Sequence, residues 1–292
     1  MRSVFGKKAC KVPIDGGFTC PNRDGTKGVG GCTFCSANGS GEFTAGAHLS
    51  ITEQIDAGAS MMRKKWADAV LIPYFQAYTS TYAPIEILKK RFGEALAHPM
   101  ASGICIATRP DCITPEIAEY LKELAKEHFV MVELGLQSTF DETAKIINRG
   151  YTYSEFLEAW HLLEGLFVCV HLINGLPGES AEMMLENARK IALLNPSAVK
   201  IHLLHVIEGT EIAKSYLAGK LHVMSLEEYV NVVCDQLEVL PPDTVIERVT
   251  GDGAKDTLLA PAWSLKKLIV QNEIDKCLFA RNSYQGIRHA QN

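Results

Sequence analysis

Three cysteines near the start of the chain lie in one short loop that is rich in glycine. The segment CPNRDGTKGVGGCTFC (20–35) separates Cys20 from Cys32 by eleven residues and Cys32 from Cys35 by two. Its glycines, its proline and its Asn-Arg-Asp-Gly turn are incompatible with a regular helix or a central strand. Such a backbone can wrap a bulky inorganic cluster and direct N–H groups at its sulfides. The loop is therefore a candidate metal-binding segment.

Two kinds of metal site are open on the cysteines alone. Three thiolates on a 4Fe–4S cluster leave one iron without a protein ligand, which is what binding and activating S-adenosylmethionine (SAM) requires. A structural zinc site needs four closed ligands, and Cys10 and His48 are the candidates for the fourth. For Cys10 a structural role is favoured. The remaining cysteines lie in strand or helix patterns and are expected to be small buried apolar residues, namely Cys105, Cys112, Cys169, Cys234 and Cys277.

The elements that must position this loop alternate between strand and helix patterns. The strand patterns are short, apolar and rich in β-branched residues, and helical patterns separate them, which is typical of βαβ units and a parallel sheet. The expected strands span 11–15, 69–78, 102–110, 129–137, 167–175 and 198–206. The expected helices span 50–66, 84–97, 114–127, 180–195, 225–240 and about 264–280, and 141–164 is largely helical with a break near Gly150. A further strand pattern covers 244–253.

The number of these units decides the expected fold class. A closed eight-stranded barrel with its helices typically needs about 250 residues, whereas the alternation here loosens after roughly residue 206. We therefore expect an α/β fold, a partial (β/α)6 TIM-like barrel over residues 1–210 with the cluster loop at 16–47. Residues 211–292 are expected to form a C-terminal α/β extension packed on that barrel.

Composition sets further limits on the function. The chain has 292 residues, of which 47% are apolar and 22% charged, and its formal net charge is −5. No global basic field indicates nucleic-acid binding, although one local basic face would suffice. The sequence shows no apolar run long enough to span a bilayer and no secretion signal, so no membrane association and a cytoplasmic location are expected. In a reducing compartment, nine cysteines favour metal binding or catalysis over a disulfide framework.

A set of motifs in a fixed order resembles a known family. They are the loop CPNRDGT…GGCTFC, then YFQAYTSTYAP (74–84), ATRPD (107–111), VELGLQS (132–138), INRGY (147–151), HLINGLPGE (171–179) and KIHLLHVIEGT (200–210). Together they resemble the YhcC/YtqA group of radical SAM proteins. The segments VCDQLEVLPP (233–242), RVTGDG (248–253) and NSYQG (282–286) look closest to the YtqA side. The group is more distantly similar to the elongator catalytic subunit and to oxygen-independent coproporphyrinogen dehydrogenase, whose partial barrel agrees with the strand count.

The resemblance implies cofactors and the residues that hold them. The cofactors are a 4Fe–4S cluster, with Cys20, Cys32 and Cys35 as its ligands, and SAM. Phe34, just before the last cysteine, is implied to lie beside the adenine. The other implied SAM contacts come from successive strand ends, where such barrels cluster their functional side chains: Gln76 and Tyr78 for the methionine amino group, Thr108, Arg109, Glu133 and Gln137 for ribose and carboxylate, Arg149 for a carboxylate, and His171, Asn174, His202 and His205. The elongator relatives have a glutamate where this chain has Ala107, and Glu133 is expected to take its place.

The resemblance also implies a reaction and partners. The YtqA side is associated with wobble uridine in tRNA, in converting 5-carboxymethylaminomethyl-2-thiouridine to 5-aminomethyl-2-thiouridine. The implied partners are tRNA as substrate, a flavodoxin or ferredoxin as electron donor, and a methyltransferase that completes the modification. Two alternatives stay open: a radical SAM enzyme for a small molecule or peptide, and a non-catalytic zinc or iron–sulfur scaffold. The TGDG segment (250–253) resembles a phosphate-binding turn, which alone is a weak signal.

Overall fold

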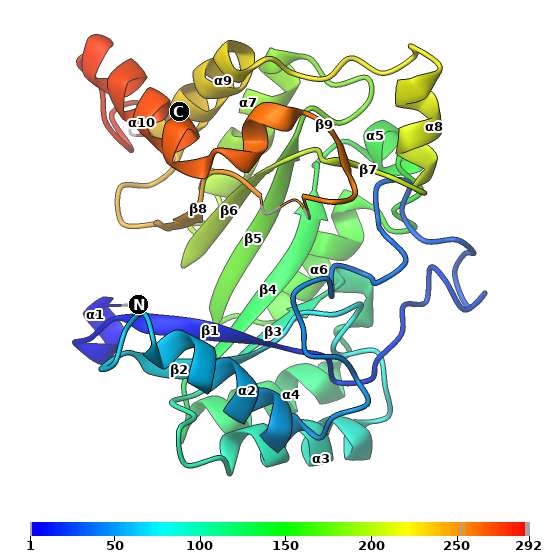
Figure 1. Ribbon diagram of the computed structural model, residues 1–292, viewed down its shortest axis with the longest axis vertical. Coiled ribbons are helices and arrows are strands. Elements are labelled where there is room, and N and C mark those ends of the chain that lie inside the picture. Colours follow the sequence, from blue (N-terminus) through cyan, green and yellow to red (C-terminus); the bar gives the residue numbers. More distant parts are fainter. Residues whose placement is uncertain (1, 252, 254, 290–292) are drawn as a thin grey trace. The chain divides into compact units, whose positions relative to one another are not determined.

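The computed structural model describes residues 2–251, 253 and 255–289 (Figure 1). Asp252, the acidic residue of the TGDG segment, lies outside the described residues. The described residues form two compact units, and the chain passes between them several times. The first unit takes its residues from the ranges Met1–Val29, Asn38–Leu134 and Glu155–Phe167. The second takes them from Gly30–Ala37, Gly135–Ser154 and Val168–Asn292.

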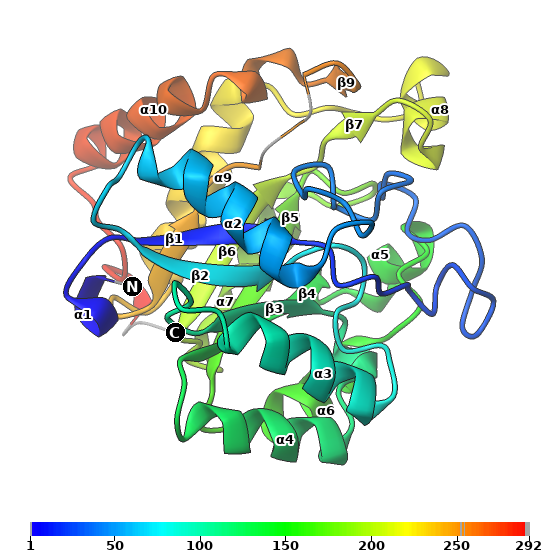
Figure 2. The ribbon, with the colours of Figure 1, turned by 60° about the horizontal axis from the view of Figure 1, so that its bottom comes forward.

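The first unit consists of parallel strands with helices packed on them. Its elements are α1 (Arg2–Phe5), β1 (Ala9–Ile14), α2 (Ile51–Arg63), β2 (Val70–Phe75), α3 (Ile85–Leu96), β3 (Ile104–Thr108), η1 (Pro110–Cys112), α4 (Pro115–Ala125), the start of β4 (Val130–Gln137) and most of α6 (Tyr153–Leu162). β1, β2, β3 and β4 pair in that order, each in parallel with the next. In both views, α3 and α4 lie side by side next to these strands and α2 runs along β1 and β2 (Figure 2).

Local signals explain where the first unit's helices begin. Ser50 caps α2, and Glu53 bonds back to the Ser50 backbone, which makes a capping box. Thr114 accepts a hydrogen bond from the backbone N–H of Ile117, and Pro115 fits the first turn of α4. Between sheet and helices the core is aromatic: the Phe75 and Phe92 rings meet edge to face, with centroids 4.9 Å apart.

The second unit continues the same architecture. Its elements are the end of β4, α5 (Asp141–Ile146), β5 (Phe167–Asn174), α7 (Ala181–Ala192), β6 (Ala198–Leu203), β7 (Val206–Ile207), α8 (Glu211–Leu217), α9 (Leu226–Val239), β8 (Val245–Arg248), β9 (Leu258–Ala260), η2 (Ala262–Leu265) and α10 (Lys267–Ala280). β5 pairs in parallel with β6, and β6 with β8. β7 and β9 form a separate antiparallel pair. Helix α9 packs against both α7 and α10.

The expected strands and helices are confirmed, with one difference in the sheet. The strand order is β1-β2-β3-β4-β5-β6-β8, so the sheet has seven strands rather than six. The seventh strand is β8, from the strand pattern at 244–253. It pairs in parallel with β6, and strands that pair in parallel are separated by a long connection in the sequence. The helical stretch 141–164 is divided into α5 and α6, with Gly150 between them at φ +81°. The domain division at residue 210 stays a prediction. Among the described residues, no helix is long and apolar enough to cross a membrane.

Candidate functional site

Cys20 lies at a tight turn of the first unit, beside an arginine. The backbone N–H groups of Arg23 and Asp24 both donate to the Cys20 carbonyl, at 2.8 and 3.2 Å. The Cys20 side chain is partly exposed, and its Sγ lies 4.0 Å from the Arg109 guanidinium. The Arg109 guanidinium is therefore a direct neighbour of this sulfur atom. The sequence motifs placed Cys20 and Arg109 on separate segments and did not pair them.

Cys32 and Cys35 lie at the ends of a second turn, in the second unit. The Cys35 N–H donates to the Cys32 carbonyl at 2.9 Å, so the two residues are held close together. Thr33 between them anchors the turn on both sides, donating to the Ile147 carbonyl and accepting from the Ile212 N–H, each at 2.9 Å. Phe34 is half-buried against the apolar cluster that contains Ile147 and Ile212. Its predicted place beside an adenine is not tested by this packing.

The chemistry of the sulfur donors fits a three-thiolate site. None of the nine cysteines is in a disulfide, all of them lying among the described residues, and the three of the loop are partly exposed. Cys10, a candidate fourth zinc ligand, is buried in an apolar cluster with Val12 and Leu71, and burial raises the pKa of its thiol. The five other cysteines were expected to be buried, and four are; Cys277 is half-buried. Within the described ranges, no three His, Cys, Asp or Glu side chains already form a metal site.

Arg109 is held in place by a buried aspartate just beyond β3. Its Nε and Nη2 donate to the two carboxylate oxygens of Asp111, at 3.0 and 2.8 Å. Lys27 lies 2.9 Å from the same carboxylate and 3.1 Å from Glu155. A two-point guanidinium–carboxylate pair fixes orientation as well as charge. Asp111 therefore positions Arg109 next to Cys20.

Glu133, on β4, has protein partners for both of its carboxylate oxygens. Lys11 of β1 lies 2.5 Å from Oε1, and the Tyr74 hydroxyl of β2 donates to Oε2 at 2.6 Å. Glu133 is 1% exposed, and burial, followed by the Glu133 charge, raises the pKa of Tyr74 well above its usual value. A bound cofactor is not needed to satisfy these oxygens, so the ribose-binding role of Glu133 stays a prediction. Thr108, at the end of β3, is also buried and its hydroxyl lies 2.5 Å from that of Thr81.

Tyr78, shortly after β2, and Gln137, the last residue of β4, both have an unusual backbone conformation. Their φ angles are +59° and +64°, a region that side chains other than Gly, Asn and Asp rarely occupy. Tyr78 N–H donates to the Gly39 carbonyl at 2.7 Å, and a Cβ on Gly39 would lie 2.3 Å from the Tyr78 ring. Gln137 accepts a hydrogen bond from the Tyr151 hydroxyl at 2.8 Å. Gln76, next to Tyr78, donates to the Ser40 carbonyl at 2.8 Å. Such strained residues concentrate at functional sites.

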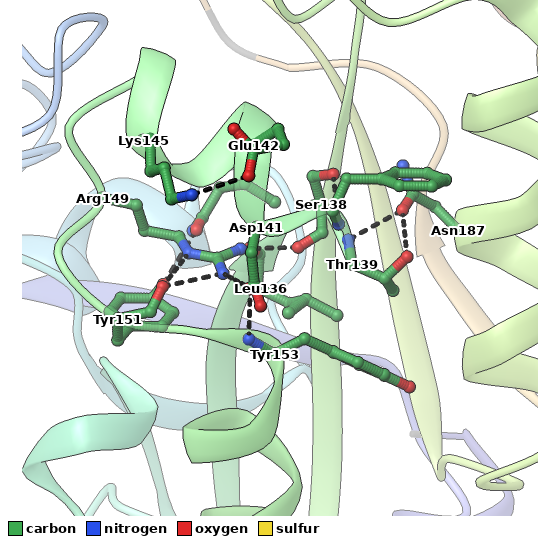
Figure 3. Close-up of polar contacts among 12 residues, drawn as sticks. Leu136, Ser138, Thr139, Asp141, Glu142, Lys145, Arg149, Tyr151, Tyr153 and Asn187 are labelled. Atoms are coloured by element: carbon green, nitrogen blue, oxygen red, sulfur yellow. Dashed lines mark hydrogen bonds and ion pairs between the residues drawn. The ribbon is translucent and has the colours of Figure 1, made fainter.

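The Arg149 side chain donates hydrogen bonds to backbone carbonyls at the end of β4 (Figure 3). Its Nη1 donates to the carbonyls of Leu136 and Ser138, both at 2.5 Å. Its Nε and Nη2 donate to the Tyr151 carbonyl at 3.0 and 2.9 Å, and Asp141 lies 3.7 Å from Nη2. The side chain is fully buried. These contacts tie Arg149 to backbone carbonyls and to Asp141 of the protein itself, and its role in binding a ligand carboxylate stays a prediction.

Amide side chains lock the neighbouring strand ends of the second unit. Asn174, at the end of β5, exchanges two hydrogen bonds with Gln236 of α9, at 2.8 and 2.9 Å. Asn187 of α7 accepts from both the backbone N–H and the hydroxyl of Thr139, each at 2.7 Å (Figure 3). Ser138 donates to Glu179, and burial raises the pKa of that carboxyl. Asn174 is thus fully engaged with α9, and its role toward a cofactor stays a prediction.

The three histidines lie on β5 and β6 and just beyond. The rings of His171 and His202 have centroids 5.2 Å apart. The Nε2 atoms of His202 and His205 are buried without a hydrogen-bond partner in the structure. Burial, then Lys267 and Arg248, lower the pKa of His205 to about 4. Burial, then His171 and nearby cations, lower the pKa of His202 well below its usual value. Both imidazoles are therefore neutral at pH 7.

Several residues of this site were not named as candidates from the sequence. They are Lys11, Lys27, Tyr74 and Asp111, of which all but Lys11 lie inside the quoted motifs. Lys11 carried a usable signal, because a lysine in the strand ACKVPI breaks an otherwise apolar pattern. The partners of Lys27 and Tyr74 lie far away in sequence, so no local pattern indicates them, whereas Asp111 lies two residues from Arg109.

The chain has relatives of known sequence and structure. The family model described as the radical SAM superfamily matches residues 20–191, and the one described as the radical SAM C-terminal domain matches 196–279. The chain is 46% identical to uncharacterized protein YtqA of Bacillus subtilis, over 98% of this chain and 89% of that protein. It is 35% identical to tRNA uridine(34) acetyltransferase of Methanocaldococcus infernus, over 51% of this chain and 28% of that protein.

The fold is shared with a solved structure. Elp3 of Methanocaldococcus infernus, with an N-terminal deletion, superimposes with a TM-score of 0.71 at 20% identity. The alignment covers 96% of this chain and 64% of that one. The expected fold class, an α/β partial barrel of the TIM-like type, is confirmed.

Proposed function

Because this chain belongs to the radical SAM superfamily, we propose that Cys20, Cys32 and Cys35 hold its 4Fe–4S cluster and that its substrate is wobble uridine in tRNA. The family implies both cofactors, the cluster and SAM. When bound, the two together supply a 5′-deoxyadenosyl radical, which begins the reaction by abstracting a hydrogen atom. The proposed conversion takes 5-carboxymethylaminomethyl-2-thiouridine to 5-aminomethyl-2-thiouridine.

The observation that carries the cluster assignment is the contrast among the cysteines. The loop offers three partly exposed free thiols on tight turns, while Cys10 is buried among apolar side chains. A donor set of three suits an iron–sulfur cluster with one open iron better than a closed zinc site. Arg109, oriented by Asp111, lies beside Cys20.

The other proposed cofactor-binding residues have well-defined roles in this chain's own architecture. Tyr78 and Gln137 are held in strained conformations at strand ends, which fixes the direction of their side chains. Lys11 and Tyr74 hold the Glu133 carboxylate in one orientation on β4. These groups are proposed to bind and orient SAM. The pairing of each charge with a protein partner keeps the site ordered before any ligand arrives.

Support for a tRNA substrate comes from two directions. One relative is named tRNA uridine(34) acetyltransferase, and the match covers 51% of this chain. The first unit also has a local basic surface around Trp66, which is 37% exposed. The Lys8 and Lys65 ammonium groups lie 3.7 and 5.5 Å from the Trp66 ring centroid, and Lys7 and Lys64 are exposed neighbours in sequence. Cations beside an exposed aromatic ring suit contact with an RNA backbone and bases, despite a net charge of −5.

The test is anaerobic reconstitution with iron, sulfide, SAM, a reductant and bulk tRNA from a strain that lacks the gene. The proposal expects 5′-deoxyadenosine and 5-aminomethyl-2-thiouridine to form together. Ala replacement of Cys20, Cys32 or Cys35 should abolish both products, whereas the matched variant Cys277→Ala should retain them. Cleavage of SAM without change in the tRNA would reject the tRNA substrate in favour of a small molecule or peptide. Zinc without iron in the purified protein would reject the enzyme proposal altogether.

The electron donor and the following enzyme can be tested in the same assay. We propose a flavodoxin or ferredoxin as donor and a methyltransferase that acts on the aminomethyl product. Replacing the chemical reductant with reduced flavodoxin should sustain 5′-deoxyadenosine formation. Absence of turnover with either protein donor would contradict this part of the proposal.

A further inference from the structure

Five exposed cations of the first unit lie where its first two long strands begin. Lys7 and Lys8 immediately precede β1. Arg63 is the last residue of α2, and Lys64 and Lys65 follow it on the way to β2. We name these five residues the amino-end basic surface, because they lie at the amino ends of β1 and β2.

Backbone and ring contacts hold the two segments of this surface next to each other. The Val70 N–H donates to the Lys8 carbonyl at 2.9 Å, where β1 and β2 begin to pair in parallel. The segments also meet at Trp66, since the ammonium groups of Lys8 and Lys65 lie 3.7 and 5.5 Å from the centroid of its ring. An aromatic ring attracts both cations and so holds two like charges close together.

The cations of this surface differ from other helix lysines of the first unit in their lack of an acidic partner. Lys89 of α3 and Lys126 after α4 each pair with a glutamate three residues earlier, at 3.0 and 2.5 Å. In the part of the chain that the structure describes, no member of the amino-end basic surface forms an ion pair. The α2 dipole accounts for cations at the end of that helix, but Lys7 and Lys8 belong to another segment. Positive charge without a counterion therefore collects here in a chain of net charge −5.

A groove beside α2 extends the surface. Its volume is about 540 Å³, and Arg63 and Lys64 line it from α2 while Met100 lines it from the segment before β3. Asp56, two turns earlier on α2, also lines the groove, and its carboxylate lies 3.3 Å from the His98 ring nitrogen. A basic groove can follow a phosphodiester backbone, which a flat basic patch cannot do as closely.

The surface lies at the opposite end of the strands from Cys20. The Thr79 N–H, after β2, donates to the Thr19 carbonyl, and Arg109, after β3, lies next to Cys20. Cys20 is thus at the carboxyl ends of the parallel strands. Because β1 has six residues, the two ends are separated by about 20 Å. A ligand that contacts both ends must span that distance, which a large RNA does and a small metabolite does not.

We propose that the amino-end basic surface binds the phosphate backbone of the tRNA body, the part of the tRNA outside the anticodon loop. This inference rests on the proposed function for the identity of the RNA. Phosphates are the same in every RNA, so the surface contributes affinity without reading sequence. It holds the tRNA while the uridine to be modified is recognised at the other end of the strands.

The test removes three charges of the surface and leaves the contact between Lys8 and Trp66 in place. The variant Lys7→Gln/Lys64→Gln/Lys65→Gln, as reconstituted holoenzyme, is titrated with full-length tRNA transcripts, with fluorescence anisotropy as the readout. Its affinity should fall about 10-fold or more at about 0.1 M salt, and the slope of log K against log salt should become shallower by about 2 to 3. Transcripts with and without a wobble uridine should lose affinity equally.

Two further variants separate position from net charge and charge from side-chain shape. Lys89→Gln/Lys90→Gln/Lys126→Gln removes the same charge from α3 and from the end of α4, and it should bind tRNA with nearly the affinity and salt slope of the wild type. Replacing the three lysines of the surface by arginine should also preserve binding. Thermal unfolding of each variant checks that its fold is intact.

The other outcomes separate the surface from the proposed function. Equal weakening in the two glutamine variants would overturn the surface, because net charge alone would explain it. Undiminished tRNA binding in the surface variant, with lost binding to vesicles of phosphatidylserine and phosphatidylcholine, would overturn the RNA assignment in favour of a membrane. If the wild type binds tRNA without converting it, the proposed function fails, and weaker binding by the surface variant still supports the surface. Conversion of tRNA by a surface variant with undiminished affinity would reject the surface alone.

Discussion

The strand ends of the two units differ in the partners of their buried titratable side chains. In the first unit each buried carboxylate meets a cation of the protein: Glu133 meets Lys11, and Asp111 meets Arg109. In the second unit the imidazoles of His202 and His205 are buried, and their Nε2 atoms make no hydrogen bond in the structure. A carboxylate paired within the protein is held in one orientation, whereas a buried imidazole stays neutral because burial penalises its charged form. The first arrangement fixes the direction of a side chain, and the second makes stability depend on pH.

The largest effect is expected from breaking the buried pair of the first unit. Glu133→Gln leaves the Lys11 ammonium, 18% exposed as a side chain, without its counterion. The free energy of unfolding should fall by about 3 kcal/mol. The double variant Lys11→Met/Glu133→Gln should lose less, because no lone charge remains buried. Denaturant unfolding of the two variants checks this, and an equal loss in both would show that the pair is not held as described.

A somewhat smaller loss is expected at the second carboxylate of the first unit. Asp111→Asn weakens the two-point contact with Arg109 and leaves Lys27 with only Glu155. We expect a loss of about 2 kcal/mol in unfolding free energy, together with a changed reduction potential of the reconstituted cluster because Arg109 loses its fixed position near Cys20. Electrochemistry under anaerobic conditions measures the potential. A stable protein with an unaltered potential would contradict the positioning role of Asp111.

In the second unit, His205 should make the free energy of unfolding depend on pH. His205 has a folded pKa of about 4 against an ordinary value of 6.5, so below pH 6.5 the unfolded chain takes up a proton that the folded protein does not. Its contribution is therefore complete above pH 6.5 and is lost as the pH falls toward 4, by about 2 kcal/mol between pH 6.5 and pH 5. His205→Asn should have a shallower pH dependence across that range. Parallel curves for wild type and variant would refute the assignment.

The smallest effect should have the opposite sign. Lys267→Gln removes one of two neighbouring cations, and since Lys267 is exposed the relief of repulsion is limited to a few tenths of a kcal/mol of added stability. Lys276→Gln, on the same helix, instead removes a surface pair with Glu273 and should be neutral or slightly destabilising. Thermal unfolding at low ionic strength resolves the two signs. A clear loss of stability in Lys267→Gln would contradict this prediction.

Local sequence patterns predicted the elements well because each element is specified by its own residues. The capped start of α4 at Thr114 and the apolar strand 129–137 are local features, and the structure confirms both. The seventh strand could not be counted in advance, because whether β8 joins β6 depends on pairing across more than 40 residues. For the same reason the Glu133 partners were missed: Lys11 is 122 residues away and Tyr74 is 59.

Residue type indicated chemistry at the site better than it indicated geometry. The buried position of Cys10 agrees with the structural role favoured for it, and the ligand role of the three loop cysteines stays a prediction. Arg149 was expected to meet a carboxylate of a ligand, and the structure directs its donors at the Leu136, Ser138 and Tyr151 carbonyls. A guanidinium can donate to a ligand carboxylate or to backbone carbonyls of the protein. Only the positions of the neighbouring carbonyls show which of the two it does.

The left-handed conformations of Tyr78 and Gln137 have a consequence for protein engineering. Three of the other non-glycine residues with positive φ are asparagines, which tolerate this conformation, but tyrosine and glutamine do not. Each position stores on the order of 1 kcal/mol that a Gly or Asn replacement would release. Directed evolution for heat resistance alone would therefore favour replacing these two residues early. Under the SAM-binding role proposed for the two residues, the resulting proteins would melt later and turn over more slowly, so a library from this chain should be screened for activity before it is screened for melting temperature.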